Sequence, residues 1–180
     1  MWGLLDVGLG QCRLVLCVDD MPLLVRTVGA GGQAWTQQIA ESLQISAKAA
    51  EVQKRDHGID PPAHGAVTGA DGSRGDEVGA LLLGALRSEL GQLAAEIKRS
   101  YEYVLTFHTQ RQAVDLLLVG GGARLKNLPE LLTAALGIPV RRASDCLSTP
   151  GCSLLCSSLR PGEFDSCALA IGLAAGRDGG

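Results

Sequence analysis

The chain has 180 residues, of which sixteen are basic and nineteen are acidic, so its formal net charge is −3 at pH 7. This length predicts one compact domain or two small subdomains around a real hydrophobic core. The slight negative charge does not indicate nucleic-acid binding, and no apolar run approaches the roughly 20 residues of a membrane-spanning helix. Asp6 interrupts the first apolar segment, and no basic residue precedes it. No signal peptide is therefore recognisable, and we expect a cytoplasmic protein.

The six cysteines raise the question of a metal site or of disulfides. Cys12 and Cys17 lie in one predicted strand, and their odd spacing places the two side chains on opposite faces. The other four lack the close paired spacing of zinc ligands, and the three histidines are scattered. We therefore expect reduced structural thiols and neither a zinc site nor a redox role.

The first predicted strand ends in a glycine turn that is suited to an anion. Residues 4–10 read Leu-Leu-Asp-Val-Gly-Leu-Gly, and a second apolar run follows at 14–18. Glycines let backbone N–H groups approach a phosphate closely, and a carboxylate such as Asp6 can hold a hydrated metal ion. Asp6 and Gly8 are candidate ligand residues for this reason, although an ordinary hairpin turn explains the same pattern.

Three strands, at residues 3–7, 12–18 and 23–28, predict an antiparallel meander because tight turns join them. Gly31 and Gly32 follow, and this turn either binds a ligand or merely connects the third strand to a helix over residues 33–43.

A second helix is expected from an N-cap at Ser46 to His57, where Gly58 ends it. Residues 58–75 carry five glycines and two adjacent prolines without periodicity. We expect this segment to be a mobile and dispensable loop.

Residues 76–108 form the longest predicted helix, with one apolar stripe that we assign to core packing: Leu82, Leu86, Leu90, Leu93, Ile97, Tyr101 and Val104. The apolar run at 113–119 is typical of a central parallel strand. Asn127 and Glu130 then resemble a capping box that opens a helix ending at Gly137. A strand at 138–140 and a helix at 164–175 complete the chain. This order favours a mixed sheet with helices on its faces.

Three consecutive glycines, Gly120, Gly121 and Gly122, follow the apolar strand. Ligands of open α/β sheets bind at the carboxyl ends of the strands. A tight turn needs one glycine, whereas three remove every side chain and let a flat ligand press against the backbone, so we favour a ligand site here. Thr36 and the helical pair Glu51 and Lys54 are ambiguous. Taken alone, the pair is better explained as a solvated ion pair worth about 0.2–0.5 kcal/mol.

The order of these motifs resembles the second half of an actin-like ATPase from the family of PilM and FtsA. Six segments match in family order: a second phosphate motif at 6–8, the stretch behind it at 26–39 (RTVGAGGQAWTQQI), the AE-x-x-K motif at 50–54, a helix at 96–103 (EIKRSYEY), an adenosine motif at 118–128 (LVGGGARLKNL) and a closing helix at 168–174 (ALAIGLA). The resemblance covers nearly the whole chain apart from residues 58–75 and 146–161.

The resemblance implies an actin-like, ribonuclease H-like α/β fold and a site for ATP with Mg²⁺. Asp6 would face the hydrated metal and, with Gly8, the phosphates. Glu51 and Lys54 would reach ribose and adenine, and the three glycines at 120–122 would line the adenosine pocket. Gly31, Gly32 and Thr36 belong to the matched stretch beside them.

The resemblance also implies an organisation into parts. Residues 1–180 would form the second actin-like domain, with a sheet subdomain of 1–29 plus 76–176 and a helical insert of 30–75, and the first domain would be absent. Half a site cannot clamp a nucleotide from both sides, so we expect at most weak ATP hydrolysis, and that only when a first domain is present. Cys12 stands where the family usually has a hydroxyl residue, and Arg13 follows it.

The leading hypothesis is a nucleotide-binding adaptor in the assembly of a type IV pilus or a related secretion system, at the cytoplasmic face of the inner membrane. Its expected partners are pilus assembly proteins of the inner-membrane platform, and self-association is left open. The alternative is a structural interaction module of the same fold that has lost nucleotide binding. A true ATPase or kinase is disfavoured, since Asp6 is the single carboxylate for which such chemistry can be argued.

Overall fold

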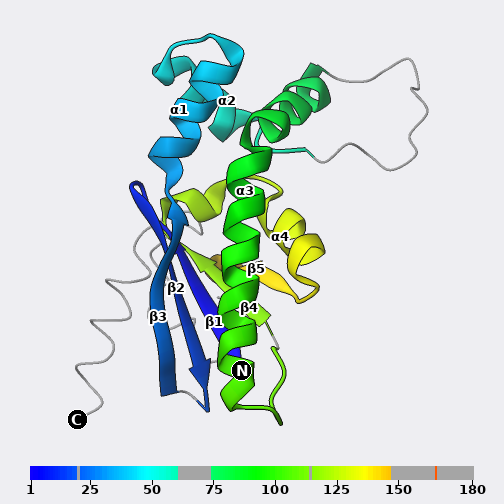
Figure 1. Cartoon of the computed structure of the whole chain (residues 1–180). Helices are drawn as coiled ribbons and strands as arrows, with labels where there is room; N and C mark the ends of the chain where they lie inside the picture. The colour runs from blue at the N-terminus through cyan, green and yellow to red at the C-terminus, as the bar shows by residue number, and fades with distance from the viewer. Residues whose placement is uncertain (20, 61–73, 114, 147–164, 166–180) are drawn as a thin grey trace, which may run out of the picture.

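A computed structural model describes residues 1–19, 21–60, 74–113, 115–146 and 165. Within these residues the centre is a five-stranded mixed sheet in the order β3-β2-β1-β4-β5 (Figure 1). Its strands are β1 (Trp2–Val7), β2 (Gln11–Val18), β3 (Met21–Ala30), β4 (Asp115–Val119) and β5 (Val140–Arg142). The first three form the predicted antiparallel meander, and β4 and β5 extend it as parallel strands.

The sheet is centred on β1, which alternates between buried and half-buried residues. Leu5 and Val7 are fully buried, whereas Leu4 and Asp6 on the opposite face are half-buried. On its other edge β1 pairs in parallel with β4, with Asp6 opposite Val119. Residues 4–7 and 116–119 are therefore neighbouring strands of the core.

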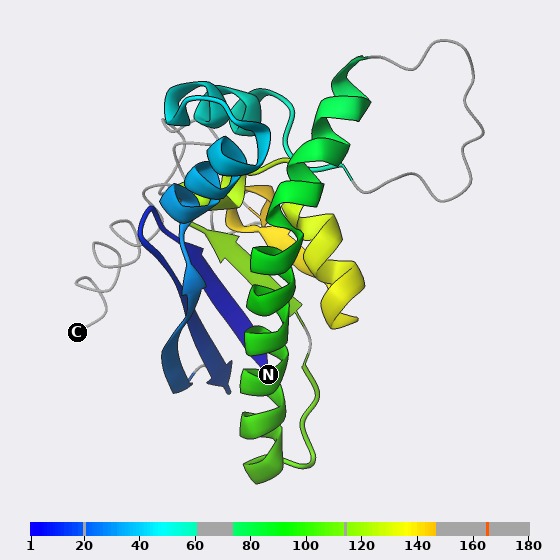
Figure 2. The same ribbon diagram turned by 45° about the horizontal axis from the view of Figure 1, so that its top comes forward.

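Four α-helices lie in the described part of the chain: α1 (Gly32–Leu43), α2 (Ala47–Asp56), α3 (Arg74–Phe107) and α4 (Leu128–Leu136). The long helix α3 runs along one face of the sheet and continues past it to contact α1 (Figures 1 and 2). Its predicted apolar stripe is buried, as expected from the spacing of the leucines. α4 packs against α3 and β5, and α1 and α2 pack together beyond the end of β1.

Helix starts show which local sequence rules hold. Ser46 caps α2 as predicted, since its Oγ accepts a hydrogen bond from Ala49 N at 3.2 Å. The capping box predicted at Asn127 is wrong: Asn127 has a φ of +65°, its side chain makes no cap bond, and its Nδ2 donates to Asp60 Oδ1 at 3.2 Å. Tertiary contact has replaced the local cap.

The last described strand, β5, covers residues 140–142 and not the predicted 138–140. Pro139 has no N–H to give to a ladder, and its carbonyl accepts from Leu116 N at 2.9 Å just before the paired residues begin. The helix predicted at 164–175 lies outside the described residues except for Asp165.

The segment predicted as a dispensable loop, residues 58–75, begins with ordered contacts, so the prediction is wrong for its first residues. Ile59 is fully buried, and its N–H donates to Lys126 O at 3.2 Å. Asp60 N donates to Gly79 O at 3.2 Å, and α3 begins at Arg74. Residues 61–73 lie outside the described part of the chain.

Cys12 and Cys17 are buried thiols. None of the described helices combines the length and the apolar character that a membrane span requires.

Candidate functional site

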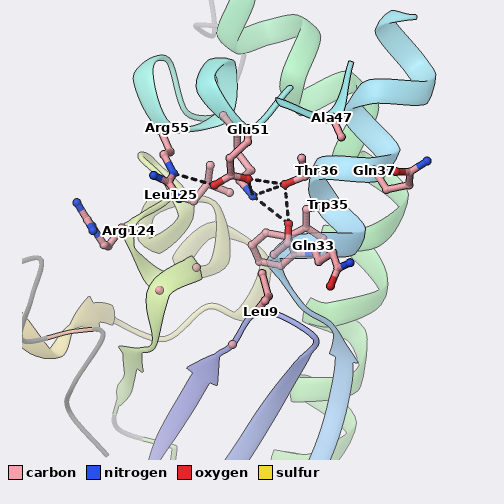
Figure 3. A pocket seen from close by; sticks show the side chains of 15 residues that line it. Leu9, Gln33, Trp35, Thr36, Gln37, Ala47, Glu51, Arg55, Arg124 and Leu125 are labelled. Carbon is pink, nitrogen blue, oxygen red and sulfur yellow. Dashed lines mark hydrogen bonds and ion pairs between the residues drawn. The ribbon is translucent and has the colours of Figure 1, made fainter. Parts of the chain in front are cut away.

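A cleft of ≈ 660 Å³ lies where the carboxyl ends of β1 and β4 meet the helical pair α1–α2. Four segments line it: the turn after β1, the first turns of α1, one face of α2, and the short 3-10 helix η1 (Gly121–Arg124) (Figure 3). Because β1 and β4 are parallel neighbours, the turns that follow them leave the sheet at the same edge. Gly8 and Gly121, one from each turn, both line this cleft.

Most of the residues predicted for the site line the cleft: Gly8, Gly32, Thr36, Glu51, Lys54, Gly121 and Gly122. Asp6, Gly31 and Gly120 lie behind this lining.

The start of α1 is fastened to the turn after β1 by backbone hydrogen bonds. Gly32 N donates to Gly8 O at 2.9 Å, and Gln33 N donates to Leu9 O at 2.8 Å. A Cβ on Gly31 would lie 2.5 Å from Gly8 O, so only glycine permits this approach. These first-turn N–H groups are occupied by the protein and are not free for a phosphate.

The three glycines at 120–122 differ in what each requires. Gly120 has a φ of +87°, and a Cβ there would lie 2.4 Å from Asp6 Oδ1; a Cβ on Gly122 would lie 2.4 Å from Val7 Cγ1. Gly121 faces open space. The argument that a turn needs only one glycine is therefore wrong, because packing against β1 requires two. Gly121 alone is left for a ligand.

Lys54 joins α2 to α1 through two hydrogen bonds and pairs with a carboxylate of its own helix. Its Nζ donates to Gly32 O at 2.9 Å and to Thr36 Oγ1 at 2.6 Å, and it forms an ion pair with Glu51 Oε2 at 2.6 Å. All three ammonium protons thus have acceptors within the protein. Thr36 Oγ1 in turn lies 2.6 Å from Glu51 Oε2 and 2.9 Å from Gly32 O, with one proton to share between them.

The interpretation of Glu51 and Lys54 as a solvated surface pair is wrong for the lysine, whose side chain is only 12% exposed. Glu51 is 34% exposed and also pairs with Arg55 at 2.7 Å. Burial alone would raise the pKa of Glu51, but hydrogen bonds from Lys54, Thr36 and Arg55 outweigh it and lower the pKa to about 2. Glu51 is therefore a carboxylate at any physiological pH.

Asp6 lies beside Gly120, at the edge of the cleft and not in its lining. Burial raises the pKa of this carboxyl above its ordinary value, against the opposing charge of Arg13. Cys12 Sγ donates to Ala30 O at 3.2 Å. Burial, with the charge of Asp6, raises the pKa of this thiol to about 12, so it stays protonated at neutral pH.

The glycine turn at 120–122 is also held from the far end of the chain. Gly120 N donates to Asp165 O at 2.7 Å. The buried carboxylate of Asp165 accepts from both Ser144 N and Ser144 Oγ at 3.0 Å. This pair of contacts fixes β4, its glycine turn and the segment after β5 to one another.

Sequence reasoning missed several residues of the cleft, mainly Leu9, Gln33, Arg55, Arg124 and Leu125. Figure 3 shows Arg55 and Arg124 together on one side of the opening. Their neighbours Lys54 and Gly122 were both singled out, so the local signal was present. What the sequence did not show is that α2 and η1 face each other.

Comparison with known proteins places this architecture in a family. A family model described as "Cell division protein FtsA" matches residues 3–158. The chain belongs to the FtsA family. No curated protein sequence matches it.

Solved structures extend the FtsA-family assignment to the fold. A chain of the "PilM-PilN type IV pilus biogenesis complex" aligns with a TM-score of 0.68 and 28% sequence identity, over 97% of this chain and 45% of that one. MreB 5 of Spiroplasma citri bound to AMPPNP aligns with a TM-score of 0.56 and 20% identity, over 97% of this chain and 55% of that one. The ethanolamine utilization protein EutJ from Carboxydothermus hydrogenoformans aligns with a TM-score of 0.54 and 21% identity, over 78% of this chain and 42% of that one.

These alignments confirm the predicted actin-like α/β fold with its meander and flanking helices. The FtsA-family chain spans less than half the length of the PilM–PilN chain that it matches.

Proposed function

We propose that this chain forms one wall of an adenine-nucleotide site and acts as an actin-like, nucleotide-binding adaptor. The observation that supports the proposal most is the convergence of four separate segments, two of them glycine turns, on one cleft at the carboxyl ends of parallel strands. That edge is where ligands of open α/β sheets bind.

The cleft suits such a ligand in size and in chemistry. Its ≈ 660 Å³ lies within the roughly 300–1,000 Å³ of small-molecule pockets. Gly121 leaves a bare backbone surface for a planar ring, and the guanidinium groups of Arg55 and Arg124 can stack on a ring or pair with phosphate. We assign adenine to this end of the cleft and the ribose hydroxyls to Glu51 and Lys54.

Magnesium would arrive with the nucleotide and neutralise phosphate charge. Mg²⁺ keeps several waters and binds through one or two carboxylates plus substrate phosphates. Asp6 is the carboxylate beside the Gly8 turn, and its place behind Gly120 suits contact through water. The raised pKa of Asp6 falls back once a cation is bound near it.

We assign the adaptor to the assembly of a type IV pilus or a related secretion system, on the cytoplasmic side of the inner membrane with pilus assembly proteins as partners. The 28% identity to a chain of the PilM–PilN complex supports this assignment. In this proposal residues 1–29 and 76–176 form the sheet subdomain and residues 30–75 the helical insert. Hydrolysis is not proposed, because phosphoryl transfer needs charge stabilisation from several sides.

One observation favours a second candidate, an interaction module of the same fold without a nucleotide. The polar groups that would receive the ligand already satisfy one another: Lys54 is bonded to Gly32, Thr36 and Glu51, and the first N–H groups of α1 are bonded to the turn after β1. A ligand would have to compete for these partners.

Calorimetric titration of the chain with ATP and Mg²⁺ tests the two candidates, together with the thermal midpoint. Binding should raise the midpoint by ligand linkage. Gly121→Val should abolish both effects while the fold is kept, since the new side chain enters open space in the cleft. Gly84→Val is the matched control, because Gly84 also faces open space but lies on α3 outside the cleft.

The absence of both binding heat and a midpoint shift at millimolar nucleotide would overturn the nucleotide proposal in favour of the interaction module. This holds provided that a longer protein carrying a first domain also shows neither signal. Equal loss of binding in Gly84→Val and Gly121→Val would also overturn it, because the effect would then not depend on the cleft.

A further inference from the structure

Arg13 lies next to Asp6, at the end of the cleft where we place the phosphates. The two residues are directly opposite each other in the antiparallel pairing of β1 with β2. Their side chains therefore extend from the same face of the sheet, with Cβ atoms about 4.5–5.5 Å apart. Arg13 is exposed and Asp6 is half-buried. The positive charge of Arg13 acts on Asp6, where it lowers the pKa of the carboxyl against the larger effect of burial.

The Arg13 side chain is held toward the turn after β1. In the amide orientation that satisfies both groups, Gln11 Oε1 accepts from Arg13 Nε at 2.7 Å and from Arg13 Nη2 at 2.5 Å. Gln11 is also bonded to Gly8, whose N–H donates to Gln11 O at 3.1 Å, and Gly8 lines the cleft. A guanidinium has five N–H donors, so two bonds to Gln11 leave Arg13 able to bind an anion as well.

Three backbone N–H groups at this end of the cleft already have protein acceptors. Gly32 N and Gln33 N donate to the turn after β1, and Gly8 N donates to Gln11 O. Glycine turns and helix starts bind phosphate through N–H groups of this kind. A phosphate at the Gly8 turn gains little from these three, so it needs positive charge from a side chain or from a metal ion.

The charges of the site favour a side chain as the source. The cleft lining carries a net charge of +2, from three basic residues and one acidic residue, in a chain whose net charge is −3. These charged residues are Lys54, Arg55, Arg124 and Glu51. A metal ion beside Asp6 would face the guanidinium of Arg13, and two cations so close together repel each other.

We propose that Arg13 is the phosphate-binding cation of the site, and that the chain binds adenine nucleotides without requiring Mg²⁺. The guanidinium contacts the phosphates from the β2 side of the turn after β1, and it neutralises Asp6, which would otherwise repel them. Arginine suits this role because its planar group can bind two phosphate oxygens at once. The inference rests on the proposed nucleotide site, and it makes the metal dispensable there.

Calorimetric titration of the full chain with ATP, in Mg²⁺ or in EDTA at matched ionic strength, tests the proposal. The dissociation constants in the two buffers should agree within about threefold. Arg13→Ser should weaken binding in EDTA by about tenfold or more, because a charged hydrogen-bond donor is lost. Binding by this variant should then depend on Mg²⁺. Arg87→Ser is the matched control, since Arg87 is likewise exposed but lies on α3 outside the cleft lining.

Adenosine, which has no phosphate, separates a phosphate contact from a change in the fold. Its dissociation constant should be the same for wild type and Arg13→Ser, and the thermal midpoints of the two proteins without nucleotide should agree. Asp6→Asn should keep or strengthen ATP binding in Mg²⁺, because it removes a carboxylate that repels the phosphates. Weaker ATP binding by Asp6→Asn would show instead that Asp6 holds the metal.

The proposal is overturned if wild type binds ATP only in the presence of Mg²⁺, or if Arg13→Ser leaves ATP binding in EDTA unchanged. Equal losses of ATP and adenosine binding in Arg13→Ser, or equal losses of ATP binding in Arg13→Ser and Arg87→Ser, would also overturn it. In each of these cases wild type still binds nucleotide, so the proposed site itself stands. If wild type binds neither ATP nor adenosine in either buffer, the proposed site is wrong and this inference is wrong with it.

Discussion

Lys54 donates to acceptors on two helices, so its removal takes a charged donor from each of them. Its side chain is largely buried between α1 and α2, and its ammonium group is the charged donor to Gly32 O, which also accepts from Thr36 Oγ1. Sequence reasoning placed Lys54 on a solvated helix surface, whereas in the structure it holds α2 to α1 in one wall of the cleft.

Lys54→Met should lower the free energy of unfolding by about 1–3 kcal/mol, because a buried carbonyl and a carboxylate each lose a charged donor. Urea denaturation measures the loss. Lys48→Met, on the exposed face of the same helix, should change stability by less than about 0.5 kcal/mol. If the two variants unfold at the same urea concentration, the network does not hold α1 to α2.

The lowered pKa of Glu51 makes part of the stability depend on pH. The pKa is about 2 in the folded chain and 4.5 in the reference state, so the contribution is complete above about pH 4.5 and is lost as the pH falls toward 2. The difference in free energy of unfolding between wild type and Glu51→Gln should therefore shrink as the pH falls from about 5 to about 2.5. A difference that stays constant over this range would show that Glu51 is not held as described.

At the scale of elements, the turn after β4 is set by its contact with β1. Gly122 lies against Val7, and Gly120 lies against Asp6 and the backbone of Val7. The glycine run looked like a ligand signal because nothing local to it distinguishes packing from binding. The distinction depends on which strand lies beside β4, and that is a property of the sheet.

Gly122→Ala should destabilise the chain by about 1–3 kcal/mol through overpacking, and Gly121→Ala should be close to neutral. In a Val7→Ala background, where the clash at Val7 Cγ1 is gone, Gly122→Ala should cost less. Thermal or urea unfolding of the four proteins gives this coupling as a double-mutant cycle. Additive effects would show that Gly122 is not pressed against Val7.

Local patterns predicted the elements better than they predicted their ends or their contacts. The meander, the α3 stripe and the Ser46 cap follow from periodicity and side-chain chemistry within a few residues. The contacts of Asn127 and Lys54 could not be predicted from local patterns. Their partners, Asp60 and Gly32, lie far away in the sequence. Ile59 was misjudged for the same reason, since its partner is Lys126.

On the scale of the whole molecule, the connection between α2 and α3 combines a buried anchor with a segment that carries little apolar sequence. Ile59→Ala should cost about 2–5 kcal/mol, because its side chain is fully buried. Replacing residues 62–72 with a short glycine–serine linker should leave the thermal midpoint nearly unchanged, since the entropy cost of closing a loop changes only slowly with its length. A large loss of stability from the linker variant would contradict this prediction.

The parallel pairing of β1 with β4 also governs the order in which the chain can fold. Trp2 lies opposite Asp115, so the central pairing of the sheet joins residues separated by more than a hundred positions. Contacts of such high sequence separation form slowly. During synthesis the three strands of the meander can pair early, whereas one edge of β1 stays unpaired until β4 has left the ribosome. Asp165, which holds the turn after β4, is made later still. The cleft is thus among the last parts of the molecule to be completed, and until then the open edge of β1 is the surface that a chaperone would find.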